Sequence, residues 1–181
     1  MSEKLPKYEI VILFEGYSTN TEEGTLANCT CTLLNGPNKI IVDTMTAWDG
    51  PKLENSLQEH NIDCNDIDYV ISTHGHSISH KQNYYNHDFK TDEYEIDDAV
   101  KVIATPGHTL QDVSVLVQTD SSLIAVVGDL FENEHDLSDD TIWKSVGSDS
   151  EELQIKSRDK ILSVADWIIP GHGSMFKNKK N

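Results

Sequence analysis

The sequence has no long apolar run. None approaches the roughly 20 residues that a membrane-spanning helix requires. The most apolar N-terminal segment is Ile10 to Phe14, flanked by Glu9 and Glu15, and this pattern indicates a strand rather than a signal sequence. We therefore expect a protein of the cytoplasm, or of the nucleus as well, with no membrane partner.

Basic residues are also few. The chain has 14 lysines and arginines against 31 aspartates and glutamates, and its formal net charge is −17. Such a charge opposes non-specific binding of nucleic acids, which depends on basic side chains that neutralise phosphates. It does not exclude an enzyme that grips a single phosphodiester through metal ions, because those ions are the largest local charges in such a site.

Cysteine is scarce, with Cys29, Cys31 and Cys64 and no CxxC spacing. Cys29 and Cys31 would lie on one face of a strand. Two interpretations remain open, a pair of small core side chains or a thiolate metal site. The odd count and the spacing favour the core pair.

A chain of 181 residues fits one domain, residues 1–181, with a core at about 8–176. The periodicity predicts an α/β protein. Helices are expected at 51–60 and 151–164, and polar, exposed stretches at 81–98 and 132–150, the second anchored by Ile142 and Trp143. Strands are expected at 8–14, 27–34, 39–42, 68–72, 100–104, 112–117, 123–127 and 167–169.

Four short motifs carry the chemistry. Each places His or Asp at a glycine-containing turn after an apolar strand. Histidine and carboxylate ligands suit zinc, and three protein ligands plus a water are common at catalytic zinc sites. A bound metal lowers the pKa of its water towards about 7. The candidate ligands are His74 and His76 in Thr73-His74-Gly75-His76, His108 in Pro106-Gly107-His108, Asp129 after Gly128, and His172 in Pro170-Gly171-His172.

The first motif ends early. A two-metal site of this kind would continue as His-x-His-x-Asp-His, but His76 is followed by Ser77-Ile78-Ser79-His80. Only 32 positions separate His76 from His108, which an internal deletion explains better than substitution. His80 is a weaker candidate ligand. Asp43, after an apolar strand, would either orient ligands or cap its loop.

Taken together, these motifs resemble the metallo-β-lactamase superfamily over nearly the whole chain. The resemblance implies an αββα sandwich with metals at one edge, here short of one helix and one strand after Ser77. It implies a first zinc site at His74, His76 and His108. The second site would be reduced to Asp129, which bridges, and His172, so we expect nearer one zinc ion than two.

The resemblance also implies a metal-dependent hydrolase that uses zinc-bound hydroxide. The subfamily it indicates is associated with endoribonuclease action on the 3′ end of histone pre-mRNA, with RNA as substrate and a homodimer as assembly. Two alternatives stay open. One is a truncated variant, weakly active or non-catalytic, with a binding role. The other is a thioesterase like the glyoxalase II enzymes.

Overall fold

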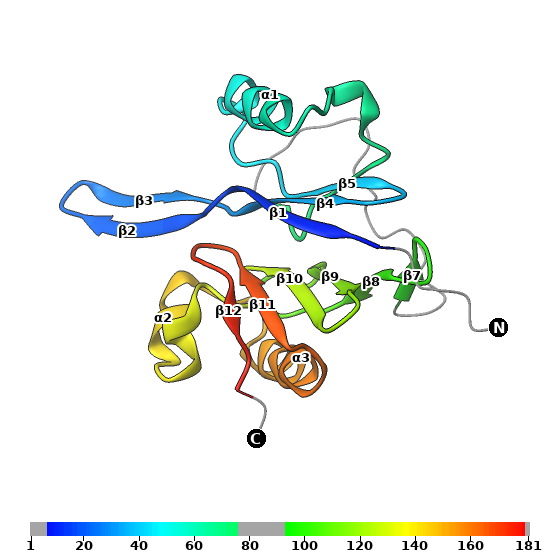
Figure 1. The fold of residues 1–181 in the computed structure, drawn as a ribbon. Helices are drawn as coiled ribbons and strands as arrows, with labels where there is room; N and C mark the ends of the chain where they lie inside the picture. Colours follow the sequence, from blue (N-terminus) through cyan, green and yellow to red (C-terminus); the bar gives the residue numbers. More distant parts are fainter. Residues whose placement is uncertain (1–6, 76–92, 180–181) are drawn as a thin grey trace.

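Two β-sheets lie face to face, and one helix covers the outer face of each (Figure 1). The computed structural model describes residues 7–75 and 93–179. The predicted αββα sandwich is confirmed by this arrangement. The shortening expected after Ser77 begins in residues that lie outside the described ones.

The first sheet has the order β1-β4-β5-β6, and all neighbours in it are antiparallel except β5 and β6. A separate hairpin, β2 and β3, extends beyond it (Figure 1). The strands are β1 (Glu9–Phe14), β2 (Tyr17–Thr21), β3 (Gly24–Asn28), β4 (Cys31–Asn35), β5 (Lys39–Val42) and β6 (Tyr69–Ile71).

The second sheet has the order β12-β11-β10-β9-β8-β7, with β10 and β11 parallel and the other neighbours antiparallel. Its strands are β7 (Glu93–Glu95), β8 (Val100–Ala104), β9 (Val113–Gln118), β10 (Leu123–Gly128), β11 (Trp167–Pro170) and β12 (Phe176–Lys177).

Three α-helices and two short 3-10 helices complete the described part of the chain. None of these helices is both long and apolar enough to cross a membrane. They are α1 (Gly50–Glu59), η1 (Cys64–Asp66), η2 (Glu134–Leu137), α2 (Thr141–Val146) and α3 (Glu151–Val164).

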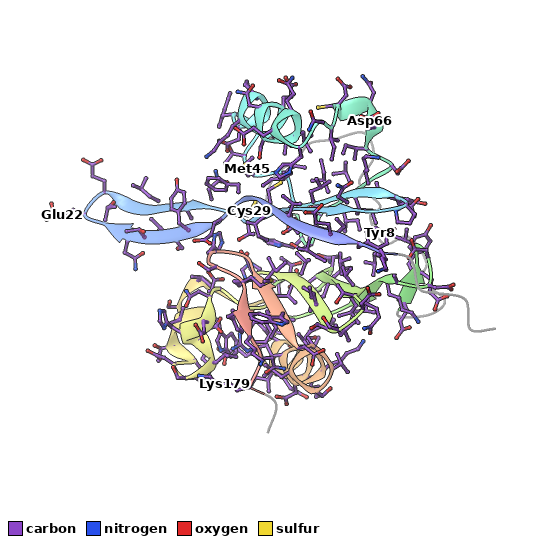
Figure 2. The ribbon with its side chains drawn as sticks, viewed as in Figure 1. Tyr8, Glu22, Cys29, Met45, Asp66 and Lys179 are labelled. Carbon is purple, nitrogen blue, oxygen red and sulfur yellow. The ribbon has the colours of Figure 1, made fainter. Side chains whose placement is uncertain are left out.

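Strand alternation explains the layers. Successive side chains of a strand point to opposite faces of its sheet. In β5, Ile40 and Val42 face the second sheet, whereas Ile41 packs towards α1 with Leu57. The second sheet follows the same rule, with one face against the first sheet and the other against α3. Figure 2 shows side chains between the two sheets and between each sheet and its helix.

The prediction of a single strand over 27–34 is wrong. The chain pairs as β3 up to Asn28 and as β4 from Cys31. Between them, the Thr30 amide donates to the Gly171 carbonyl of the other sheet at 2.7 Å instead of to a neighbouring strand. That bond interrupts the ladder and turns β2 and β3 away as a hairpin.

The stretch 132–150 is only partly exposed, contrary to the prediction. Trp143 is buried as expected of an anchor, but Glu132 and Asp136 are buried too, each 2% exposed. Arg158 of α3 explains the burial of Asp136, because its guanidinium donates to the Asp136 carboxylate at 3.0 Å and lies over the Phe131 ring. A charged partner makes burial of the carboxylate tolerable.

Candidate metal centre

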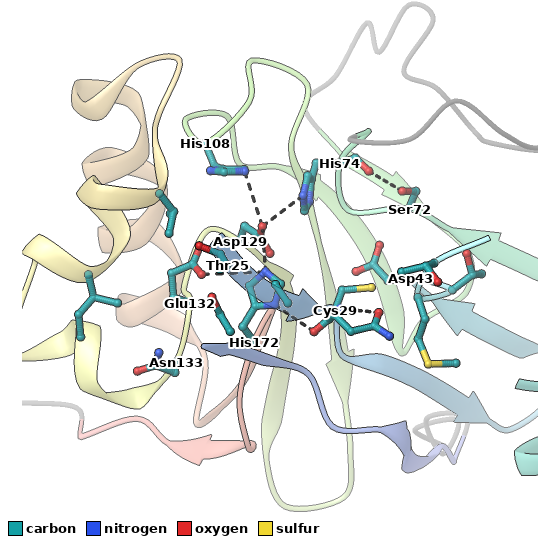
Figure 3. Close-up of a pocket in the computed structure, with 18 of the residues that line it drawn as sticks. Thr25, Cys29, Asp43, Ser72, His74, His108, Asp129, Glu132, Asn133 and His172 are labelled. Carbon is teal, nitrogen blue, oxygen red and sulfur yellow. Dashed lines mark hydrogen bonds and ion pairs between the residues drawn. The ribbon is translucent and has the colours of Figure 1, made fainter. Parts of the chain in front are cut away.

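Four of the five predicted ligands meet at one end of the sandwich, between the two sheets (Figure 3). His74 follows β6, His108 follows β8 and Asp129 follows β10. His172 follows β11. The motifs are far apart in sequence, but each lies just after a strand that ends at this edge. His76 and His80 lie outside the described residues, so their predicted roles stay predictions.

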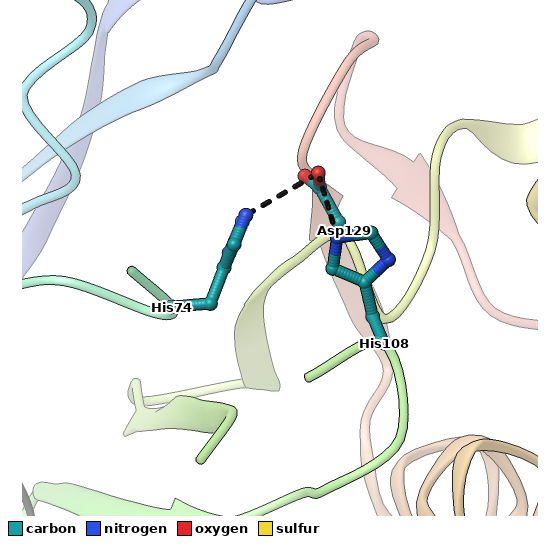
Figure 4. Close-up of side chains that lie close together, drawn as sticks. All are labelled: His74, His108 and Asp129. Atoms are coloured by element: carbon teal, nitrogen blue, oxygen red, sulfur yellow. Dashed lines mark ion pairs between the residues drawn. The ribbon is translucent and has the colours of Figure 1, made fainter. Parts of the chain in front are cut away.

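Asp129 is the centre of the group. Its Oδ2 lies 3.4 Å from His74 Nε2, 3.6 Å from His108 Nε2 and 3.3 Å from His172 Nε2. Figure 4 shows His74 and His108 approaching this carboxylate from two sides. All three rings therefore direct the same nitrogen at one oxygen.

The opposite nitrogen of each of two rings is bound to a backbone carbonyl. His108 Nδ1 lies 3.0 Å from the Gly147 oxygen, and His172 Nδ1 lies 3.0 Å from the Asn28 oxygen. A carbonyl can only accept, so Nδ1 carries the hydrogen in both. In the neutral rings, Nε2 then turns a lone pair towards the Asp129 carboxylate. Such a contact is repulsive unless a cation, either a proton or a metal ion, lies between the two atoms.

His74 is oriented through Thr73 and Asp43. The Thr73 hydroxyl donates to Asp43 Oδ2 at 2.9 Å, and the Thr73 amide donates to Asp43 Oδ1 at 2.9 Å. The hydroxyl oxygen lies 3.0 Å from His74 Nδ1 and accepts the hydrogen of that ring. Asp43 thus acts on the ring through Thr73, the arrangement expected of an outer carboxylate that orients a metal-binding histidine.

The electrostatics follow from this geometry. Burial opposes protonation of His74 and His172, but the Asp129 carboxylate outweighs it and raises the pKa of each to about 9. Burial alone would raise the pKa of Asp129, whereas hydrogen bonds from His172 and His74 hold it well below its usual range. Burial raises the pKa of Asp43 to about 6 against the attraction of His74. Without a metal, the site therefore binds protons.

Glu132 belongs to the same group, and the sequence reasoning passed over it. Its Oε2 lies 4.0 Å from His172 Nε2, and its side chain is buried. Burial and the nearby Asp129 charge raise its pKa to about 7. The signal was present in the run Gly128-Asp129-Leu130-Phe131-Glu132, where a second acid follows the first by three positions.

The residues fit divalent metal ions. Two groups each bring three ligand atoms within 4.8 Å of one another: His74, His108 and Asp129, and Asp129, Glu132 and His172. Ligands at about 2.1 Å around tetrahedral zinc lie about 3.4 Å apart, close to the observed nitrogen–oxygen distances. Within the part of the chain that the structure describes, Asp129 Oδ1 and Glu132 Oε1 are buried without a hydrogen-bond partner. Buried carboxylate oxygens of this kind call for a cation.

Glycine is required beside the centre. A Cβ on Gly171 would collide with Asp129 Oδ1, and a Cβ on Gly128 would collide with the Thr73 hydroxyl. Gly128 also has φ +53°. The Gly-Asp and Gly-His pairs of the motifs thus let two turns approach closely enough to share one carboxylate.

The cysteines do not form a thiolate pair. Cys31 is buried between the first sheet and α1, whereas Cys29 lines the pocket over the metal centre. Burial, reinforced by the Asp43 charge, raises the pKa of the Cys29 thiol to about 12 and that of Cys31 further. Among the described residues, neither thiol belongs to a group of ligand atoms that could hold a metal ion, which disfavours the alternative of a thiolate metal site.

An open pocket of about 1180 Å³ lies over the metal centre. The β2–β3 hairpin borders it on one side and α2 on the other. Trp48, 89% exposed, lies at its rim in the loop after β5. A substrate can therefore reach the ligands from solvent.

Comparison with known proteins identifies the family. Residues 24–77 match the family model of the metallo-beta-lactamase superfamily. A Xenopus laevis relative, metallo-beta-lactamase domain-containing protein 1, is 37% identical over 94% of this chain and 82% of its own length. The chain belongs to the metallo-β-lactamase superfamily. The resemblance predicted from the four motifs is confirmed, as is the more specific similarity to proteins of that name.

Two further comparisons show how far the similarity to known proteins extends. The Rattus norvegicus protein of the same name is 35% identical over 76% of this chain, but the match spans only 62% of its own length. The crystal structure of a quorum-quenching N-acyl homoserine lactone lactonase has a TM-score of 0.62, with 18% identity over 89% of this chain and 88% of that one. This second likeness supports the fold alone.

Proposed function

We propose that this chain is a zinc-dependent hydrolase that cleaves single-stranded RNA, with the 3′ end of histone pre-mRNA as the substrate class that the resemblance implies. The main support for a hydrolase is the convergence of His74, His108 and His172 on Asp129 beneath an open pocket. The RNA substrate rests on the motif resemblance. We also propose that the protein acts in the cytoplasm or the nucleus and that it assembles as a homodimer.

The residues divide the work. Bound zinc supplies a nucleophile from water at neutral pH and polarises the bond to be cleaved. His74 and His108 hold their Nε2 atoms towards it, because Thr73 and the Gly147 carbonyl fix the opposite nitrogens. Asp129 belongs to both groups of possible ligands and would contribute to either. His172, whose Nδ1 is fixed by the Asn28 carbonyl, would be a ligand in the second group.

A thioesterase is the second candidate, and the pocket favours it. The described residues that line the pocket include no lysine or arginine, while Asp43, Asp129 and Glu132 are among them. The whole chain carries a net charge of −17. Such a pocket repels polyanions and accepts uncharged carbonyl substrates more readily. RNA must then rely on the ions alone to offset its phosphates.

One assay distinguishes an RNA hydrolase, a thioesterase and a non-catalytic binding protein. The zinc-loaded chain is given single-stranded RNA and a small uncharged thioester side by side, with a D129N chain as control. We expect RNA cleavage that D129N abolishes. Thioester hydrolysis without RNA cleavage would support the second candidate. If zinc binds but neither substrate is hydrolysed, the remaining alternative is the non-catalytic variant with a binding role.

A further inference from the structure

The burial of the Glu132 carboxylate is not explained by its hydrogen bonds. It is 2% exposed, and within the described residues its Oε1 has no hydrogen-bond partner. Its Oε2 is 4.0 Å from His172 Nε2, which is too long for a hydrogen bond. Burial of an unpaired carboxylate is costly, and native proteins retain one mainly where an ion or a reaction uses it.

The position of Glu132 is built into the fold. The His172 amide donates to the Glu132 carbonyl at 2.9 Å, and the Gly171 amide donates to the Phe131 carbonyl at 3.0 Å. The loops after β10 and β11 therefore run side by side in a fixed register. That register places the Glu132 side chain beside the His172 ring (Figure 3).

The other side of the Glu132 backbone is fixed as well. Its amide donates to Asp136 Oδ2 at 2.7 Å, and Asp136 is held by the buried Arg158 guanidinium. Asp136 is thus committed to a structural pair, whereas the Glu132 carboxylate a few residues before it is not. Two buried acids four positions apart therefore have different partners, and only Glu132 faces the metal centre.

We infer that Glu132 is a ligand of a second metal ion, held with Asp129 and His172. The three residues offer ligand atoms within 4.8 Å of one another. Glu132 would then supply a donor in place of the Asp-His pair that is absent after Ser77. The inference rests on the metal centre of the proposed function, and it raises the expected number of ions from one to two.

This ligand set is also chemically distinct from the first. Asp129 and Glu132 contribute oxygens and His172 one nitrogen, whereas the first group has two histidines and one carboxylate. Oxygen-rich sites accept harder cations such as Mn²⁺ more readily than histidine-rich sites do. The two positions should therefore differ in their response to manganese.

The test is zinc stoichiometry on the full chain. Metal is stripped with a chelator, the chain is loaded with Zn²⁺ alone, and bound zinc is counted by mass spectrometry of the metal. We expect two ions in the wild-type chain, one in E132Q and two in the control E134Q, whose exposed side chain lies two positions further along at the start of η2. A wild-type chain with one ion, or an E132Q chain with two, would overturn the inference. H80A should keep both ions, and loss of one ion in H80A would overturn it too.

Thermal unfolding distinguishes a ligand from a structural residue. E132Q keeps the size of the side chain and removes its charge, so zinc should raise the unfolding temperature less in E132Q than in the wild type. An equal rise in both chains, or an E132Q chain that does not fold, would show a structural role and overturn the inference. A wild-type chain that binds no zinc at all contradicts the proposed function instead, so the two failures are distinguishable.

Discussion

The two ligand groups of the metal centre share Asp129 but differ in how their other members are held. In the first group, His74 and His108 each have a fixed partner for Nδ1. In the second, His172 has such a partner, but Glu132 has a buried oxygen without one among the described residues. The histidines of the first group are therefore oriented before metal binds, whereas the second group includes a buried carboxylate oxygen without a hydrogen bond and a Glu132–His172 contact of only 4.0 Å. The difference indicates that one site is defined by motif residues and the other depends on packing.

Substitution of Asp129, the carboxylate that both groups share, should impair metal binding in both groups. In D129N, both groups lose the anionic oxygen that the histidines approach. Because metal-assisted stabilisation contributes several kcal/mol, we expect hydrolysis to fall by about a thousand-fold or more. Zinc counting should find neither ion tightly bound. If D129N keeps one ion, the two groups do not share a ligand.

Removal of one histidine from each group should separate them. H108A should lose the ion of the first group and keep the second, whereas H172A should do the reverse. Each variant then binds one ion in place of two. Replacement of the remaining zinc by Mn²⁺ distinguishes the two ions. The ion left in H108A should exchange for Mn²⁺ more readily than the ion left in H172A. Equal exchange in both variants would contradict the assignment.

A smaller effect is expected from the outer partner of His74. D43N weakens the hold on Thr73 and, through it, on the ring. Loss of an outer-shell partner typically lowers metal affinity 10–100-fold. The effect should be confined to the first ion, as measured by calorimetric titration of the stripped chain. T73V, which removes only the hydroxyl, should act similarly, and the double variant should be little worse than either alone. Additive losses would show that Asp43 acts by another route.

The mildest test is pH. In the metal-free chain, the pKa values of His74 and His172 are raised to about 9, above the usual value of 6.5. Zinc must displace these protons, so its affinity should rise by about tenfold per pH unit for each proton released and level off above pH 9. Metal-free stability should show the opposite trend. The contribution of these histidines is complete below pH 6.5 and is lost as the pH rises through 9.

Thermal unfolding of the stripped and loaded chains across that pH range measures both trends. The unfolding temperature of the stripped chain should fall between pH 6.5 and 9. The difference in unfolding temperature between the loaded and the stripped chain should grow over the same range. A stripped chain whose stability does not change over this range would contradict the binding of protons by His74 and His172 beside the Asp129 carboxylate.

Local patterns in the sequence predicted much of the fold. Helix α3 has the predicted bounds of 151–164, and β8 has the predicted bounds of 100–104, since period and turn residues are local properties. The break at Thr30 was missed, because it depends on a hydrogen bond to Gly171, which is distant in sequence. The β2–β3 hairpin was missed for the same reason.

The sequence by itself determined the strands, the turns after them and the ligand types at those turns, because hydrophobic period, glycine and histidine are all visible locally. Only the tertiary structure decided which acids belong to the centre. Asp136 pairs with Arg158, while Glu132 lies beside His172, and the two acids differ because backbone pairing between the loops after β10 and β11 sets their directions. That pairing joins segments about 40 residues apart, and such a contact exists only once the second sheet has formed.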